Sequence, residues 1–357
     1  MANGSNRSGV TATLADVARE AGVSTATAAR ALGGYGSVSK AARERVTEAA
    51  HTLGYQRNEL AATMITGRSN TVGLVVADIE NPFFAATARG VSDVARAAGY
   101  EVVLVNTDED VDTERSAVQV LVSKRVDGII VAPASPVDVE HLAATQRAGC
   151  PVVLLDRQVE RLAADVVLVD NLGAASNVTE RLLSAGHERI AMVTGGASSA
   201  DQDTLDRPSV SSGRDRVDGY LAALSEAGVS QPRAYLRTGA HTRQLAERLT
   251  TQLLHLAQPP TAVFASDSVV ALGVLKALRA ADKRIPREVS LVTFDDADWT
   301  GVVAPAISVV AQPAQELGKC AAEILLERIA GATYPARSYV KSTTFVSRDS
   351  IAPPSKD

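Results

Sequence analysis

The sequence predicts a small all-helical N-terminal unit followed by two α/β lobes, each built on a doubly wound parallel sheet. Residues 13–55 show apolar spacing typical of helices, with turn residues between the segments. From Thr71 onward short apolar runs alternate with helical segments, and this pattern occurs twice. Such alternation is typical of a parallel sheet covered by helices on both faces.

Caps and a glycine turn predict the first two helices. Thr13 stands three residues before Asp16, a capping-box pattern that begins a helix. Gly22 supplies the left-handed residue that ends this helix. Ser24 can then cap a second helix over residues 25–32. Two helices joined by a tight glycine turn have the arrangement of a DNA-reading helix-turn-helix.

A third amphipathic helix, SKAARERVTEAAHTLGY, completes the predicted head. Its inward face is expected to comprise Ala42, Val46, Ala49, Ala50 and Leu53. The second helix lies in GVSTATAARAL and carries Arg30 as its single charge. Taken alone, it could be an alanine-rich bundle helix with a solvated arginine. The helices predicted on either side favour a DNA-reading role.

The apolar runs after Thr71 are predicted to be buried parallel strands. The first set is TVGLVVA, EVVLVNT, DGIIVAP, PVVLLD and VVLVD, with helices beginning near Phe83, Thr113 and Val137. The second set is IAMVTG, AYLRTG, AVFAS and VSLVTF, with helices beginning near Ala174, Arg214, Thr242 and Ser268. A ligand site is expected at the carboxyl ends of the strands.

Composition and charge narrow the class of protein. The 357 residues are 46% hydrophobic and 22% charged, as in globular proteins of two or three domains. Residues 1–68 carry a net charge of +3 and the rest −8, so a polyanion would meet the head. No apolar run reaches the ~18 residues of a membrane span. The N-terminal segment lacks a signal peptide's apolar core, which indicates a cytoplasmic protein.

The sequence motifs that would indicate an enzyme or a metal site are incomplete or missing. GGYGSVSK lacks the Gly-Lys-Ser/Thr ending of a phosphate loop, and DEDVDTE lacks the glycine and glutamate of a calcium loop. No G-x-S-x-G motif occurs. Cys150, Cys320 and the five histidines show no ligand spacing. No cofactor, no metal and no enzymatic activity are therefore expected.

Several ordered motifs resemble the lactose-repressor (LacI/GalR) family of bacterial transcription regulators. The chain contains, in order, TLADVAREAGVS, RERVTEAAHTLGY, TGRSNTVGLVV, NPFF, NTDED, RVDGIIV, FDD and SRDS. The resemblance implies a DNA-binding domain at 12–57, a hinge helix at 58–69 and a periplasmic-binding-protein-like effector and dimerisation domain at 70–352. It implies lobes of about 70–169 plus 312–335, and about 170–311 plus 336–352.

By this resemblance, residues can be assigned to DNA recognition. Thr25 and Ala26 match the first-turn positions that choose base pairs, and Arg30 matches an arginine that reaches a guanine edge or a phosphate. An arginine fork can donate two hydrogen bonds to guanine. Met64 matches a residue that wedges into the minor groove; the alternative is a linker with Met64 exposed to solvent. The whole implied set is Thr13, Ser24, Thr25, Ala26, Thr27, Arg30, Asn58 and Met64.

The resemblance also implies an effector site between the lobes. A carboxylate opposite a guanidinium suits a sugar, because Asp295 would accept hydrogen bonds from hydroxyls and Arg216 would donate them. Asn171 and Asp267 could equally be helix caps, and Phe84 could be core. The implied set is Phe84, Asp156, Arg157, Asn171, Arg216, Asp267 and Asp295.

The predicted function is that of a sequence-specific transcriptional regulator, a repressor, controlled by a small molecule such as a sugar. The expected partners are a palindromic double-stranded operator, the effector and a second copy of the chain, with no membrane. The protein would associate with the nucleoid when bound to DNA. Two alternatives stay open: a sugar-binding module without a DNA role, and a sugar-acting enzyme on a similar scaffold.

Overall fold

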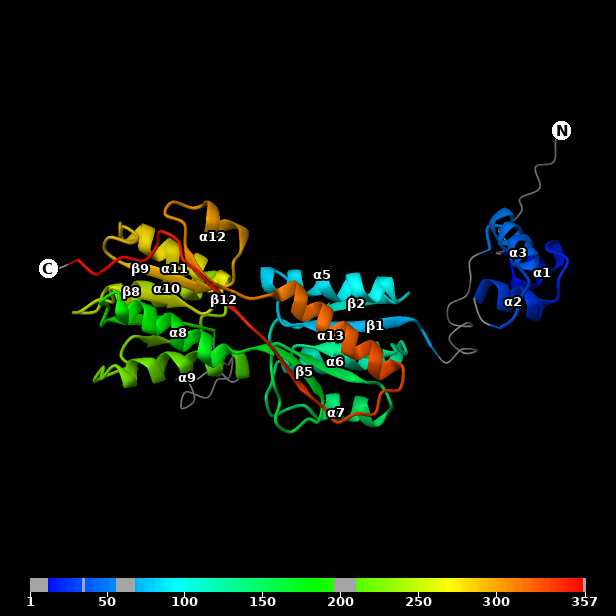
Figure 1. Ribbon diagram of the computed structural model, residues 1–357, viewed down its shortest axis with the longest axis horizontal. Coiled ribbons are helices and arrows are strands. Elements are labelled where there is room, and N and C mark those ends of the chain that lie inside the picture. The colour runs from blue at the N-terminus through cyan, green and yellow to red at the C-terminus, as the bar shows by residue number, and fades with distance from the viewer. Residues whose placement is uncertain (1–11, 34–35, 56–67, 196–209, 356–357) are drawn as a thin grey trace, which may run out of the picture. The chain divides into compact units, whose positions relative to one another are not determined.

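The computed structural model describes residues 12–33, 36–55, 68–195 and 210–355 (Figure 1). They belong to two compact units, which divide between Ser69 and Asn70. No helix in these ranges is long and apolar enough to cross a membrane.

In the first unit, the described residues form a head of three helices, α1 (Leu14–Glu20), α2 (Thr25–Gly33) and α3 (Lys40–Thr52). The predicted capping box is confirmed: the Thr13 hydroxyl accepts from the Asp16 amide, and the Asp16 carboxylate accepts from the Thr13 amide. Gly22 has a φ of +62°, as the turn requires. The buried core is Val17, Ala18, Ala21, Ala28, Ala31, Val46, Ala49 and Ala50.

One core prediction for the head is wrong. Leu53 was expected to face inward with α3, but its exposed fraction is 36%. α3 ends at Thr52, so Leu53 is the C-cap, and the chain turns at Gly54, whose φ is +60°. Tyr55 packs against the core beyond this turn. Helical spacing therefore stops predicting burial at the last helical residue.

The first lobe is a parallel sheet in the order β11-β5-β4-β3-β1-β2. Its strands are β1 (Thr71–Val76), β2 (Glu101–Asn106), β3 (Gly128–Val131), β4 (Val152–Leu155), β5 (Asp165–Val169) and β11 (Ser338–Lys341). Its helices are α5 (Pro82–Ala97), α6 (Val111–Ser123), α7 (Glu140–Arg147) and α13 (Ala314–Ile329).

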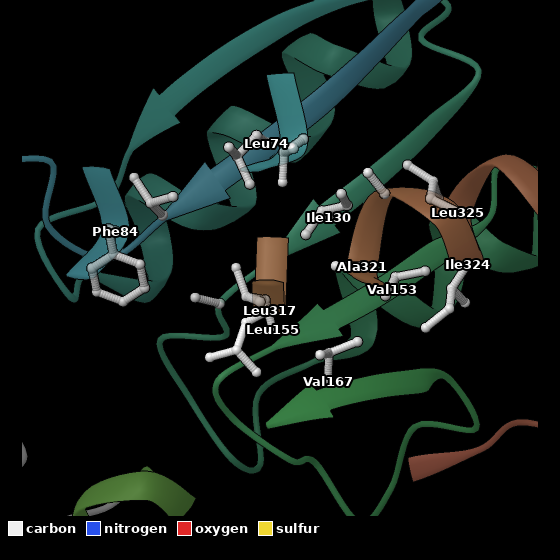
Figure 2. Close-up of a cluster of buried hydrophobic side chains, with 14 of the residues drawn as sticks. Leu74, Phe84, Ile130, Val153, Leu155, Val167, Leu317, Ala321, Ile324 and Leu325 are labelled. Carbon is white, nitrogen blue, oxygen red and sulfur yellow. The ribbon is translucent and has the colours of Figure 1, made fainter. Parts of the chain in front are cut away.

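Two apolar clusters hold the helices of this lobe on the two faces of the sheet. One cluster joins β1 and β3–β5 to α5 and α13, which lie side by side although they are far apart in sequence (Figure 1). In Figure 2 Leu317 and Leu325 of α13 lie among strand side chains such as Val153. The second cluster joins the same strands to α6 and α7. Burial on both faces is the reason that these strands are almost continuously apolar.

The second lobe repeats this plan in the order β12-β10-β9-β8-β6-β7. Its strands are β6 (Ile190–Val193), β7 (Leu236–Arg237), β8 (Ala262–Ala265), β9 (Ser290–Phe294), β10 (Ser308–Ala311) and β12 (Thr344–Val346). Only β12 pairs antiparallel with its neighbour among these strands of the described chain. The helices are α8 (Asn171–Ser184), α9 (Ser211–Glu226), α10 (Arg243–Leu254), α11 (Ser268–Ala280) and α12 (Asp298–Val302).

Within the described residues, the chain passes from one lobe to the other three times: after β5, between β10 and α13, and between β11 and β12. The third crossing differs from the sequence expectation, which gave all of 336–352 to the second lobe. Instead β11 extends the first sheet by pairing with β5, and the crossing falls between Lys341 and Thr344. Pairing satisfies the backbone groups that β5 would otherwise leave open at the sheet edge.

Candidate functional site

The first turn of α2 presents small side chains to solvent. Ser24, Thr25 and Ala26 are exposed. The Ser24 hydroxyl accepts from the Thr27 amide at 3.1 Å and shares a hydrogen bond with the Thr27 hydroxyl at 2.8 Å. Ser24 therefore acts as the N-cap of α2, as predicted. The cap fixes the turn that carries Thr25 and Ala26.

Arg30 lies one turn further along α2, and its side chain is exposed. Its side chain passes so close to Gly36 that a Cβ there would lie 3.3 Å from its Cδ. Within residues 12–33 and 36–55, two other arginines have protein partners: Arg19 pairs with Asp16, and Arg45 donates to the Ala21 carbonyl at 3.2 Å. No such pair forms for Arg30 within those two ranges, so its guanidinium can reach an external acceptor.

Of the remaining predicted DNA-binding residues, Thr13 lies within the described residues and two others lie outside them. Thr13 is exposed, but its hydroxyl is engaged with the Asp16 carboxylate at 2.6 Å, so its side chain orients α1. Asn58 and Met64 lie outside the described residues.

In the second unit, Arg216 of α9 is held rigidly. Its Nε donates to the Asn171 side-chain oxygen at 2.8 Å, and its Nη1 donates to the Ser266 carbonyl at 2.7 Å. The guanidinium carbon also lies 4.0 Å from the centroid of the Phe294 ring. A cation over an aromatic face is stabilised by the ring quadrupole. The arginine is thus placed in advance, as a binding group must be.

Asp295 follows β9 with a φ of +70° and is only 7% exposed. Gln312, at the crossing into α13, donates to one of its oxygens at 2.7 Å. Burial raises the pKa of Asp295 to about 6; Arg216 opposes this, whereas the carboxylates of Asp267 and Asp156 add to it. These charged groups therefore share one electrostatic neighbourhood, in which burial disfavours the ionised form of Asp295.

Asp156 and Arg157 lie after β4 at the junction of the lobes. The Asp156 carboxylate accepts from the Ser212 hydroxyl of α9 at 3.1 Å, and the neighbouring Gln158 amide donates to the Ser211 hydroxyl at 2.8 Å. These bonds join the first lobe to the N-terminus of α9 in the second. A group bound here would be contacted from both lobes.

Arg157 is almost fully buried, and its guanidinium is paired with a carboxylate that is not among the predicted site residues. Glu109 receives two hydrogen bonds from its guanidinium, at 2.7 and 2.5 Å. The Pro133 carbonyl accepts a third at 3.0 Å. Glu109 lies in NTDED, one of the motifs that carry the family resemblance, and no role in the site was predicted for it. Gln312 was missed as well, because no pattern distinguishes it in AQP.

For Asp267, Asn171 and Phe84 the sequence left a structural role open beside ligand binding, and the structure shows what each side chain contacts. Asp267 caps α11, since its carboxylate accepts from the amides of Val269 and Val270 at 2.9 Å. Asn171 does not act as the cap of α8; Asp170 does, and Asn171 instead orients Arg216. Phe84 packs in the core of the first lobe, edge-on to Phe83, at the end of the sheet (Figure 2).

The described residues contain no group of three or more His, Cys, Asp or Glu side chains arranged to hold a metal ion. The junction of the lobes contains four carboxylates and two guanidiniums, and each of them is held by a hydrogen bond within the protein. The carboxylates are those of Glu109, Asp156, Asp267 and Asp295, and the guanidiniums are those of Arg157 and Arg216. Such groups can bind a polar molecule by hydrogen bonding.

Comparison with known proteins agrees with both halves of the structure. The model for periplasmic binding proteins and the sugar binding domain of the LacI family matches residues 69–349, and that for bacterial regulatory proteins of the lacI family matches 13–58.

Individual relatives match over nearly the whole chain. The ribose operon repressor of Halalkalibacterium halodurans is 34% identical, over 94% of this chain and 96% of its own. The transcriptional repressor CytR of Escherichia coli is 32% identical, over 90% of each chain. The solved complex of the regulator CelR with cellobiose is 29% identical, covers 95% of this chain and 99% of its own, and has a TM-score of 0.70. The chain therefore belongs to the lacI family of bacterial regulatory proteins.

Proposed function

We propose that this protein is a transcriptional repressor that binds a palindromic operator as a homodimer and changes its affinity for DNA when a small polyhydroxy molecule enters the junction of the lobes. The observation that carries the effector half is Asp295, a buried carboxylate with a raised pKa. Burying such a group is costly unless hydrogen-bond donors surround it. In the described chain Gln312 supplies one donor. Vicinal hydroxyls of a ligand would supply others.

In the DNA-binding half, residues 12–57 form the head and 58–69 the hinge. Thr25, Ala26 and Arg30 face bases, whereas Thr13, Ser24 and Thr27 hold the helix ends against the backbone. Asn58 and Met64 contribute from the hinge. A two-fold operator follows from the dimer, because two identical heads read two identical half-sites about one helical turn apart.

In the effector half, Arg216 and Asp295 contact the ligand directly, and Asn171 orients Arg216. Asp156 and Arg157 approach from the first lobe, with Phe84 at the end of its sheet and Asp267 behind Asp295. A sugar is the favoured class, since named relatives include a ribose operon repressor and a regulator solved with cellobiose. Contacts from both lobes let the ligand change their relative position and thereby the geometry of the heads. The protein acts in the cytoplasm, at the nucleoid when DNA is bound.

The test combines a thermal-shift screen of sugars and nucleosides with operator binding. An operator is first selected from random double-stranded DNA, and affinity is measured at fixed salt against a scrambled duplex. We expect at least one compound to raise the melting temperature of the protein and to change operator affinity. Equal affinity of the protein for operator and scrambled DNA would rule out sequence-specific regulation and leave the alternative of a sugar-binding module. Light scattering should show a dimer, and a monomer at micromolar concentration would contradict the assembly.

A further inference from the structure

The Arg157 guanidinium is already neutralised by a residue of its own lobe. Both oxygens of Glu109 accept from it, at 2.7 and 2.5 Å, in the bidentate geometry that is strongest for this pair. The Arg157 side chain is 7% exposed, whereas that of Glu109 is 40% exposed. Glu109 therefore stands between the arginine and solvent. An approaching ligand would meet the carboxylate before the guanidinium.

Electrostatics keep this pair ionised. Burial acts to raise the pKa of Glu109, but the charge and hydrogen bonds of Arg157, together with a smaller effect of His241, outweigh it, and the pKa is lowered. The backbone also favours the pair: Glu109 sits in a left-handed turn with a φ of +63°, directly after Asp108 at +52°. In this conformation the Glu109 carboxylate reaches Arg157, which follows β4.

The surrounding charges are predominantly negative. Glu109, Asp156, Asp267 and Asp295 carry carboxylates, and Arg157 and Arg216 carry guanidiniums. Asp156 links the two groups, because it lies 3.6 Å from Arg157 and interacts electrostatically with Asp295. A further buried carboxylate, Glu114, contributes to the raised pKa of Arg157 and is itself held by His141 at 2.7 Å and by the Ala134 amide at 2.7 Å. An added anion would therefore meet an excess of carboxylates over guanidiniums.

We propose that Glu109 is a specificity-determining residue: by occupying Arg157 it restricts the junction to neutral hydroxylated ligands and rejects the same molecules when they carry a phosphate or carboxylate. This inference rests on the proposed function only in taking the lobe junction as the effector site. Arg157 without Glu109 would be a buried guanidinium with two donors directed at solvent, which is the geometry that binds phosphate.

The probe is inorganic phosphate, titrated by calorimetry into the full-length protein at constant ionic strength. Wild type should show no saturable binding, whereas Glu109→Ala should gain a saturable phosphate site, at least tenfold tighter than any wild-type affinity. Alanine at a φ of +63° is no more strained than glutamate, because both carry a Cβ. Glu109→Gln removes the charge while keeping a hydrogen-bond acceptor, and it should gain a weaker site.

Two controls locate the effect. Glu101→Ala removes an exposed carboxylate at the start of β2 and should gain nothing. The double variant Glu109→Ala, Arg157→Gln should lose the gained site. The inference is overturned if wild type binds phosphate as tightly as Glu109→Ala, or if neither Glu109 variant gains binding. Because no DNA or effector is present, failure here is distinct from failure of operator binding, which tests the proposed function.

Discussion

A single charged side chain on α2 is expected to decide how the head discriminates between DNA sequences. Thr25 and Ala26 offer at most a hydroxyl and methyl contacts, whereas Arg30 offers a fork of donors without a protein partner in the described head. Arg30→Ala should therefore lower the affinity for a selected operator by ~1–3 kcal/mol and keep the fold, because each bidentate contact to a base contributes about this much. Fluorescence anisotropy against operator and scrambled duplexes measures the change.

Arg43→Ala provides the matched control, since it also removes one positive charge from an exposed position of the head. Both variants should lose similar non-specific affinity, which depends on phosphate contacts. Only Arg30→Ala should narrow the ratio between operator and scrambled DNA. An unchanged ratio in that variant would show that Arg30 contacts no base.

Asp295 should lower stability at neutral pH. Its folded-state pKa is raised from 3.8 to about 6, so between these values the folded state holds a proton that the unfolded state has lost. Stability therefore falls as pH rises through this window, and above it the ionised group costs roughly 3 kcal/mol. Asp295→Asn should be more stable than wild type at pH 7.5, by up to that amount, and similar at pH 4. Urea unfolding at pH 7.5 and pH 4 measures the free energy of unfolding of both proteins. If the variant differs from wild type by the same amount at both pH values, the pKa of Asp295 is not raised.

The same carboxylate should be required for the response to effector. Asp295→Ala should fold, dimerise and bind operator, because no DNA contact is assigned to it, yet lose the change in affinity that a ligand produces. Operator titrations with and without the compound found by thermal shift measure this. A response at the wild-type ligand concentration would show that Asp295 is structural only.

At the scale of elements, α5 and α13 touch through their backbones. A Cβ on Gly318 would lie 2.0 Å from the Thr87 carbonyl oxygen, and one on Gly90 would lie 2.1 Å from that of Gln315. Gly318→Ala should therefore cost about 1–3 kcal/mol or more, although alanine otherwise favours a helix. Gly301→Ala in α12 is the control, since nothing lies within 4 Å of its Cβ position. A neutral Gly318→Ala in urea unfolding would mean that the helices can separate without cost.

The strands illustrate which parts of the fold the sequence could predict and which it could not. The central strands were recognisable because burial on both faces makes them continuous apolar runs, as in β4. β10, β11 and β12 escaped prediction. The side chains of β11 and β12 are half-exposed and their position depends on pairing with distant strands, whereas β10 is buried and its short run SVVA was missed. In the site, Arg216 and Asp295 were selected through motifs of the family resemblance. Glu109 and Gln312 could not be found this way, because only the folded chain brings them to Arg157 and Asp295.

On the scale of the whole molecule, the two units differ greatly in what stabilises them. The buried core of the head consists of two valines and six alanines, whereas the body has four clusters rich in Leu, Ile, Val and Phe. Apolar area buried sets most of the stabilising free energy, and small units bury the smaller fraction of their surface. The head should therefore be marginally stable without DNA.

Calorimetry of the full chain should then show two transitions, with the head unfolding at the lower temperature. A ligand stabilises only the unit that binds it in the native state. Operator DNA should thus raise the first transition, and the effector should raise the second. If the head and body instead unfold in one transition that both ligands raise together, the units are energetically coupled, and the effector signal reaches the DNA through their shared stability and not through a change in lobe geometry.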